Sequence, residues 1–153
     1  MLRITRLTDY GFILLAQMCE EEGALFNAKD LSEQLAIPLP TVSKVLKLLV
    51  QGSLLASHQG SQGGYRLARA ASAISAAEII EVLEGPVSMT ACCITDGCDR
   101  NCAVSNSWQK VNAVIVDKLR SVSLAEMVAD DREDAKKEAF LNSKGFNVAG
   151  AIE

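Results

Sequence analysis

Two amphipathic segments, separated by a proline-marked turn and followed by a glycine-tipped hairpin, limit the folds open to this chain. Asn27 can cap a short helix that runs to Ala36, where the tripeptide 37–39 interrupts it. Pro40 stands where a first helical turn tolerates proline, and it opens a second helix that reaches about Gln51. Residues 54–58 and 65–67 are predicted to be short strands joined by the polar, glycine-rich stretch 59–64. This order of elements predicts a winged helix-turn-helix.

Further helices are predicted on both sides of this unit. One runs from Thr8, as its N-cap, to Glu22, with Gly23 as the stop. Ser75 and the glutamate three residues later match a capping box that starts a helix ending at Gly85. A long helix is predicted over residues 103–122, with a short final turn at 124–127.

The predicted fold class is therefore mainly α with a small β-hairpin: a winged helix-turn-helix domain plus a long C-terminal dimerisation helix. The predicted divisions are a DNA-binding domain over 1–85, a cysteine loop over 86–102, the dimerisation helix over 103–128 and a poorly ordered tail over 129–153.

The charge distribution points to a polyanion partner for the first half only. The whole chain carries a net charge of −4, but residues 1–72 hold seven basic and six acidic side chains, and none between Glu33 and Glu78 is acidic. The second helix of the pair fits a DNA major groove, and a slim glycine tip can approach the minor groove. The tip carries no arginine, so we expect only a modest electrostatic attraction between the hairpin and the minor groove. We also expect the DNA affinity to depend moderately on salt concentration. The predicted DNA-binding residues are Pro40, Thr41, Ser43, Lys44, Lys47, Gln59, Ser61, Gln62, Gly63, Gly64, Tyr65 and Arg66.

The long C-terminal helix carries an apolar seam. Its apolar residues advance by 4, 3, 4, 4 and 3 positions, close to the 3.5-residue spacing of paired helices. This spacing predicts a face that pairs with another helix. The seam consists of Val104, Trp108, Val111, Ile115, Leu119 and Val122.

Cys92, Cys93, Cys98 and Cys102 lie within eleven residues of a turn-rich loop. Thiolates on such a loop can converge on a soft metal centre, either zinc or an iron–sulfur cluster. Bare surface thiols and a thiol–disulfide switch are the alternatives. The fifth cysteine, Cys19, lies in the first helix and is predicted to belong to the core.

Several protein classes do not fit this sequence. No apolar run reaches the roughly 18–20 residues that a membrane helix needs, and the N-terminus lacks a secretory pattern, so we expect a cytoplasmic protein without membrane contact. A single histidine, His58, argues against most acid–base enzymes. We therefore expect a non-enzymatic protein.

These residues together resemble the winged-helix iron–sulfur regulators that include IscR and NsrR, and most closely the subgroup that regulates the SUF iron–sulfur assembly operon. The resemblance covers residues 1–128 in order. It is carried by Leu7-Thr-Asp-Tyr-Gly11, Ile37-Pro-Leu-Pro-Thr-Val-Ser-Lys-Val-Leu46, Gly63-Gly-Tyr-Arg-Leu67, Ile79-Ile-Glu-Val-Leu-Glu-Gly85, the three-cysteine loop and Trp108.

The resemblance implies a homodimeric repressor that binds a double-stranded DNA operator and controls iron–sulfur assembly genes. It also implies a [2Fe-2S] or [4Fe-4S] cluster held by Cys92, Cys98 and Cys102, with zinc as the alternative metal. The histidine that follows the third cysteine in IscR is absent here, so the fourth ligand must come from elsewhere. Asp9 of the partner subunit is the first choice and Cys93 the second. The alternative functions are a nitric-oxide- or redox-sensing repressor of stress genes and a non-regulatory thiol- or metal-handling protein.

Overall fold

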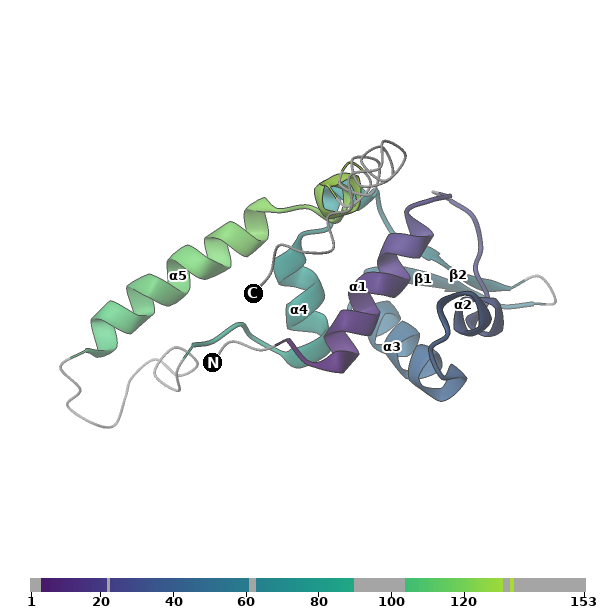
Figure 1. Ribbon diagram of the computed structural model, residues 1–153, viewed down its shortest axis with the longest axis horizontal. Coiled ribbons are helices and arrows are strands. Elements are labelled where there is room, and N and C mark those ends of the chain that lie inside the picture. The colour runs from purple at the N-terminus through teal and green to yellow at the C-terminus, as the bar shows by residue number, and fades with distance from the viewer. Residues whose placement is uncertain (1–3, 22, 61–62, 90–103, 131–132, 134–153) are drawn as a thin grey trace, which may run out of the picture.

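The computed structural model describes residues 4–21, 23–60, 63–89, 104–130 and 133. Helices α1 (Arg6–Met18), α2 (Ala28–Leu35) and α3 (Leu39–Gln51) precede a two-stranded antiparallel hairpin of β1 (Leu55–His58) and β2 (Gly64–Leu67). The 3-10 turn η1 (Ala71–Ala73) and helices α4 (Ala76–Glu84) and α5 (Ser105–Ser121) follow, and residues 124–130 are also helical. Figure 1 shows α1–α4 and the hairpin gathered in one body from which α5 extends to one side. The predicted fold class, mainly α with a small β-hairpin and a winged helix-turn-helix, is confirmed.

A single apolar core joins α1–α4, the hairpin and residue 124. The inward residues of α3 recur at helical spacing, so one face of this helix is completely buried while the opposite face stays in solvent. Cys19 packs against this core, as predicted. The largest fully buried side chains are Leu14, Leu15, Met18, Leu31, Leu46, Leu49, Leu54, Ile74, Ile79, Leu124, Val42 and Val45.

The turn between α2 and α3 is fixed by local bonds. Ala36 ends α2 in the left-handed region with φ of 53°. The Ser32 hydroxyl donates to the carbonyl of Ile37 at 2.6 Å, and the Ile37 side chain is only 4% exposed. Pro40 occupies the first turn of α3, where its missing N–H removes no helical bond, as the sequence predicts. The angle between α2 and α3 is therefore set rigidly.

The predicted bounds of the first helix are wrong at both ends. Thr5, not Thr8, is the N-cap of α1, and the Thr8 side chain is instead completely buried and donates to the Glu84 carboxylate. The helix ends at Met18, four residues before the predicted end at Glu22. Three successive glutamates at 20–22 oppose the helix dipole at a C-terminus, which accounts for the early stop.

Two contacts between distant segments complete the body. Phe26 and Tyr65 form a backbone bridge beside β2, and Ser75 pairs with Ser123 beside the start of α4. The capping box predicted at Ser75 is confirmed, and the same pattern recurs at Ser123, where it starts the helical stretch 124–130. The predicted final turn is thus longer than expected. The predicted tail, 129–153, lies outside the described residues apart from 129, 130 and 133.

Candidate nucleic-acid interface and cysteine segment

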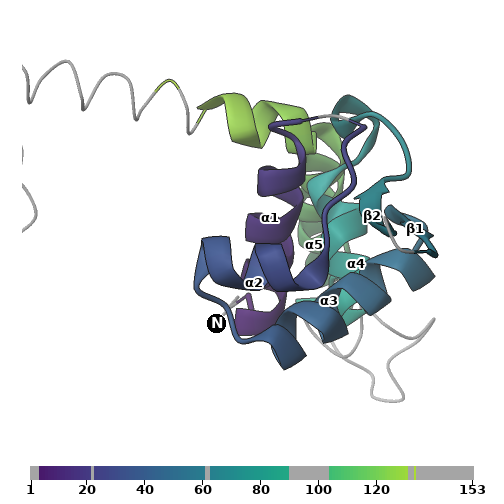
Figure 2. The same ribbon diagram turned by 90° about the vertical axis from the view of Figure 1, so that its right-hand side faces the viewer.

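The outer face of α3 presents polar and cationic groups on a rigid helix. Ser43, Lys44 and Lys47 are exposed, as is Pro40, and Thr41 is half-buried. Figure 2 shows α3 at the periphery of the body, below α1 and α2. Since the opposite face of α3 is buried in the core, the helix can enter a groove only with these predicted residues in front.

The hairpin stands beside α3 as the wing. Arg66 and Gln59 are exposed, whereas Tyr65 is half-buried and packs against the core. The backbone of Tyr65 exchanges two hydrogen bonds with Phe26, of 2.8 and 2.9 Å. A Cβ on Gly64 would lie 2.7 Å from the carbonyl oxygen of Phe26, so this glycine serves close backbone packing as well as a slim wing. Gly63 is half-buried, and Ser61 and Gln62 lie outside the described residues.

The cationic side chains near the predicted interface divide into two groups. Lys44, Lys47 and Arg66 lie on the exposed faces of α3 and β2. Arg69 instead bonds the Glu78 carboxylate at 2.6 Å. Hydrogen bonds from Ser75, and next from Arg69, lower the pKa of Glu78 and keep it ionised. The charge of Arg69 is thus directed to α4, whereas the three side chains of the first group stay exposed on the elements predicted to contact DNA.

The four clustered cysteines, Cys92, Cys93, Cys98 and Cys102, lie outside the described residues, but both ends of their segment are in place. Residues 85–89, which we call the linker segment, lead from α4 toward them. Their backbone is clamped by Asn112 of α5: the Met89 amide donates to Asn112 Oδ1 at 2.9 Å, and Asn112 Nδ2 donates to the Val87 carbonyl at 3.2 Å. Cys92 follows Met89 by three positions, and Cys102 precedes the start of α5 by three. Both chain ends of the cysteine segment are therefore attached to α5.

Glu84, the last residue of α4, connects the linker segment to the start of α1. Its carboxylate accepts from the Thr5 amide at 2.8 Å and from the buried Thr8 hydroxyl. The bond from Thr8, followed by that from Thr5, lowers the pKa of Glu84. Asp9 is next to Thr8 in the first turn of α1 and is exposed. Asp9, the candidate fourth ligand, is therefore held in a fixed position relative to Glu84, the residue after which the linker segment begins.

Helix α5 keeps an apolar face in solvent. None of its residues is buried, and Val104, Trp108 and Val111 of the predicted seam are 52%, 39% and 45% exposed. Val114, which the sequence spacing missed, is 69% exposed and widens this face. Ile115 and Leu119 are half-buried, and the carbonyl of Val122 accepts from the Ala76 amide at 2.9 Å. The predicted seam therefore divides into an exposed N-terminal half and a C-terminal half that packs on its own body.

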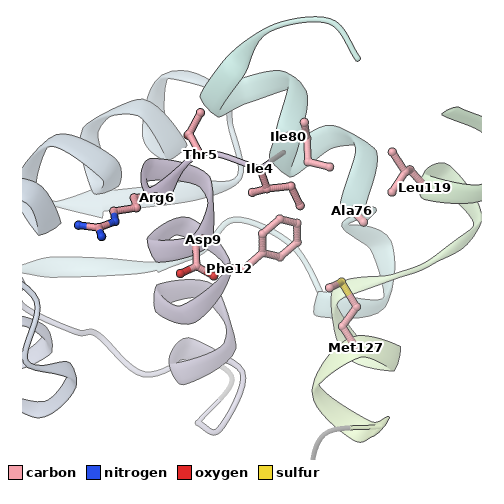
Figure 3. Close-up of a pocket in the computed structure, with 9 residues that line it drawn as sticks. All are labelled: Ile4, Thr5, Arg6, Asp9, Phe12, Ala76, Ile80, Leu119 and Met127. Atoms are coloured by element: carbon pink, nitrogen blue, oxygen red, sulfur yellow. The ribbon is translucent and has the colours of Figure 1, made fainter. Parts of the chain in front are cut away.

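A groove of about 590 Å³ runs between α1, α4 and the C-terminal end of α5. Figure 3 shows Phe12 and Ile80 along it, with Asp9 and Arg6 on the α1 side. Its lining is mostly apolar, with a carboxylate and a guanidinium at the rim. The lining residues are Ile4, Thr5, Arg6, Asp9, Phe12, Ala76, Ile80, Leu119 and Met127. Within the part of the chain that the structure covers, no helix is long and apolar enough to cross a membrane.

Comparisons with known proteins agree with this geometry. IscR of Xenorhabdus nematophila is 31% identical over 154 residues, covering 91% of this chain and 93% of that protein. IscR of Erwinia tasmaniensis is 33% identical over 130 residues, covering 80% of this chain and 78% of that protein. Both are named as helix-turn-helix transcriptional regulators, which supports the expectation of a non-enzymatic protein.

Solved structures of similar fold also belong to transcriptional regulators. The structure of CymR, the global cysteine regulator of B. subtilis, superposes with a TM-score of 0.69 at 25% identity, covering 84% of this chain and 98% of that one. T. potens IscR superposes with a TM-score of 0.68 at 26% identity, covering 87% and 90%. The profile of the Rrf2 family, described as iron-dependent transcriptional regulators, matches residues 4–130. The chain therefore belongs to the Rrf2 family of DNA-binding transcriptional regulators.

Proposed function

We propose that this regulator is a homodimeric repressor of iron–sulfur cluster assembly genes that senses through a cluster bound by Cys92, Cys98 and Cys102. The observation that carries the proposal is the attachment of the cysteine segment. One end leaves α4 of the DNA-binding body through the Asn112 clamp, and the other end enters α5. Both ends are thus held by α5, and the first also continues from α4, so a change in ligation that alters the Asn112 clamp would alter how α5 is attached to the body.

The donor set fits a soft metal centre. Cysteine thiolates are the usual ligands of iron–sulfur clusters and also bind zinc. Three of them, with Asp9 or Cys93 as the fourth, can complete a cluster or a zinc site. When bound, a [2Fe-2S] or [4Fe-4S] group would supply an oxidisable and removable centre, which is the property that a sensor needs. A carboxylate oxygen is a weak ligand for cluster iron, so closure by Asp9 would favour release.

The exposed face of α5 supports the homodimer. Because α5 has no buried residue, covering its apolar face would stabilise it. The groove beside α1 is lined mostly by apolar side chains, so it is a surface against which this face can pack. If the exposed face of α5 in one subunit covers the groove of the other, it brings Val104, which follows Cys102 by two positions in the sequence, to the groove that Asp9 of the partner subunit lines. A ligand role for Asp9 across the interface requires this arrangement. A homodimer would also present two copies of α3 to the two halves of an operator.

The experiment is an anaerobic purification followed by an absorbance spectrum from about 300 to 700 nm with iron and sulfide counts. We expect a coloured protein for the unchanged chain and a colourless, folded dimer for Cys98→Ala. Cys19→Ala is the matched control, because Cys19 packs against the core and is distant in sequence from the four clustered cysteines, and it should stay coloured.

Asp9→Ala and Cys93→Ala identify the fourth ligand, since only the variant that lacks it should lose its cluster faster in air. A colourless protein that iron and sulfide cannot reconstitute would contradict the cluster proposal. One stoichiometric zinc per subunit would then make zinc the metal.

A nitric-oxide- or redox-sensing repressor of stress genes is the second candidate. Similarity to CymR, described as a global cysteine regulator, favours a role linked to thiol or sulfur chemistry. Intact operator binding by the Cys98→Ala variant, together with disulfide-dependent loss of binding in the unchanged chain, would favour this candidate. Membership of a transcriptional-regulator family argues against the third alternative, a non-regulatory thiol-handling protein.

A further inference from the structure

The first turn of α3 carries an exposed apolar side chain that the predicted interface omitted. Leu39, the first residue of α3, is 42% exposed, and Pro40 beside it is also exposed. The remaining exposed residues of α3, Ser43, Lys44, Lys47 and Gln51, are polar or cationic. The leading end of α3 is thus apolar, whereas the following turns are polar.

The position of Leu39 is fixed by the turn that precedes it. The carbonyl of Pro38 accepts from the amides of Thr41 and Val42 at 2.9 and 3.1 Å, which closes the first turn of α3. On the N-terminal side, the buried Ile37 side chain anchors the chain in the core. Leu39 therefore presents its exposed surface from a rigid helix end.

This apolar surface is continuous with the cationic face of the same helix. Lys44 and Lys47 follow Leu39 within about two helical turns, and no acidic residue occurs in residues 34–77. In helix-turn-helix proteins the N-terminal residues of the second helix meet the base edges. Among the four bases, only thymine presents a methyl group in the major groove, and apolar side chains are the groups that contact it.

We propose that Leu39, flanked by the Pro40 ring, is a specificity-determining residue that contacts the C5-methyl group of a thymine in each half of the operator. The inference concerns how this DNA-binding regulator selects its operator sequence. It does not depend on the cluster proposal. It requires the operator to carry a thymine in each half-site whose methyl group contributes to affinity.

The test begins with a random duplex library from which the purified unchanged protein selects its preferred sequence. Each thymine of that sequence is then replaced by deoxyuridine, which removes the methyl group and leaves the base pairing unchanged. Burying one methyl-sized group is worth ~0.8 kcal/mol, so we expect affinity to fall about fourfold for one half-site and about 16-fold for both. The loss should occur at one symmetric pair of positions.

Substitutions then assign the effect to the side chain. Leu39→Ala should bind the thymine and deoxyuridine duplexes equally, and Leu39→Met, which keeps an apolar chain of similar volume, should retain the discrimination. Leu25→Ala is the matched control, because Leu25 is similarly exposed at 46% but lies between α1 and α2. It should discriminate like the unchanged protein.

Two results would refute the inference. The first, measured on the unchanged protein alone, is equal affinity for the thymine duplex and for every deoxyuridine duplex. The second is discrimination between these duplexes that persists in Leu39→Ala. Failure to enrich any sequence would instead contradict the DNA-binding activity itself, so the two failures are distinguishable.

Discussion

Asn112 provides the sharpest test of how the cysteine segment is attached to α5. Its side chain accepts from the Met89 amide and donates to the Val87 carbonyl. We expect Asn112→Ala to release the linker segment while leaving α5 folded. Asn112→Asp is the matched variant, because its carboxylate still accepts from Met89 but cannot donate to Val87.

The magnitude follows from the two bonds. A net contribution of about 1 kcal/mol each makes local opening of the linker segment easier by ~2 kcal/mol in Asn112→Ala, or about 30-fold in the opening equilibrium. Alanine is a better helix former than asparagine by up to ~0.7 kcal/mol, which offsets part of the loss in global stability. The global free energy of unfolding should therefore change by only about 1 kcal/mol. Asn112→Asp should show an intermediate opening.

Hydrogen exchange of the apo protein measures this opening without any cluster. The Met89 amide should exchange about 30-fold faster in Asn112→Ala, while amides in the core of α3 keep their unchanged rates. In the loaded protein, the ratio of operator affinities with and without the cluster should move toward one. Unchanged exchange at Met89 in Asn112→Ala would refute the clamp.

Three further outcomes are expected. In urea unfolding at fixed subunit concentration, Thr8→Val should lower the free energy of unfolding by ~1 kcal/mol at pH 7 through the lost bond to Glu84, whereas the loss in Thr8→Ser, which keeps the hydroxyl but lacks the buried methyl group, should not depend on pH. Because folding lowers the pKa of Glu84 from 4.5, this stabilisation is present above about pH 4.5 and is lost as the pH falls through the folded value; a difference independent of pH would contradict the bond. Val114→Glu, at a position 69% exposed within one subunit, should give a helical monomer by sedimentation, and a retained dimer would remove Val114 from the interface. Lys47→Gln should lower the slope of log affinity against log salt by about 2 per dimer, while Lys110→Gln on α5 should leave it unchanged.

The sequence predicted the helix-turn-helix well because its signals are local. Apolar spacing in α3 and the side-chain cap at Asn27 depend on residues within a turn or two, and both are present in the structure. The capping box at Ser75 is equally local and is also confirmed. These elements fix the orientation of the predicted DNA-contacting face.

The errors occur where distant residues decide between local alternatives. The sequence predicts Thr8 as the N-cap, but Thr5 takes that place in the structure, and the Thr8 hydroxyl instead bonds Glu84, which lies 76 positions away. The bridge between Ser75 and Ser123 likewise joins segments that no local pattern connects. The role of Asn112 was missed because a polar residue in an exposed helix gives no sequence signal until its partners in the linker segment are known.

Operator affinity measured on one anaerobic preparation, before and after cluster removal, tests the central claim most directly. Allosteric coupling of 1–3 kcal/mol corresponds to roughly a 5- to 150-fold difference between the two states, and its sign identifies the form that represses. The account predicts a difference of at least about fivefold in the unchanged protein and none in Cys98→Ala. Equal affinities of the loaded and cluster-free protein for the operator would contradict a sensing role for the cysteine segment.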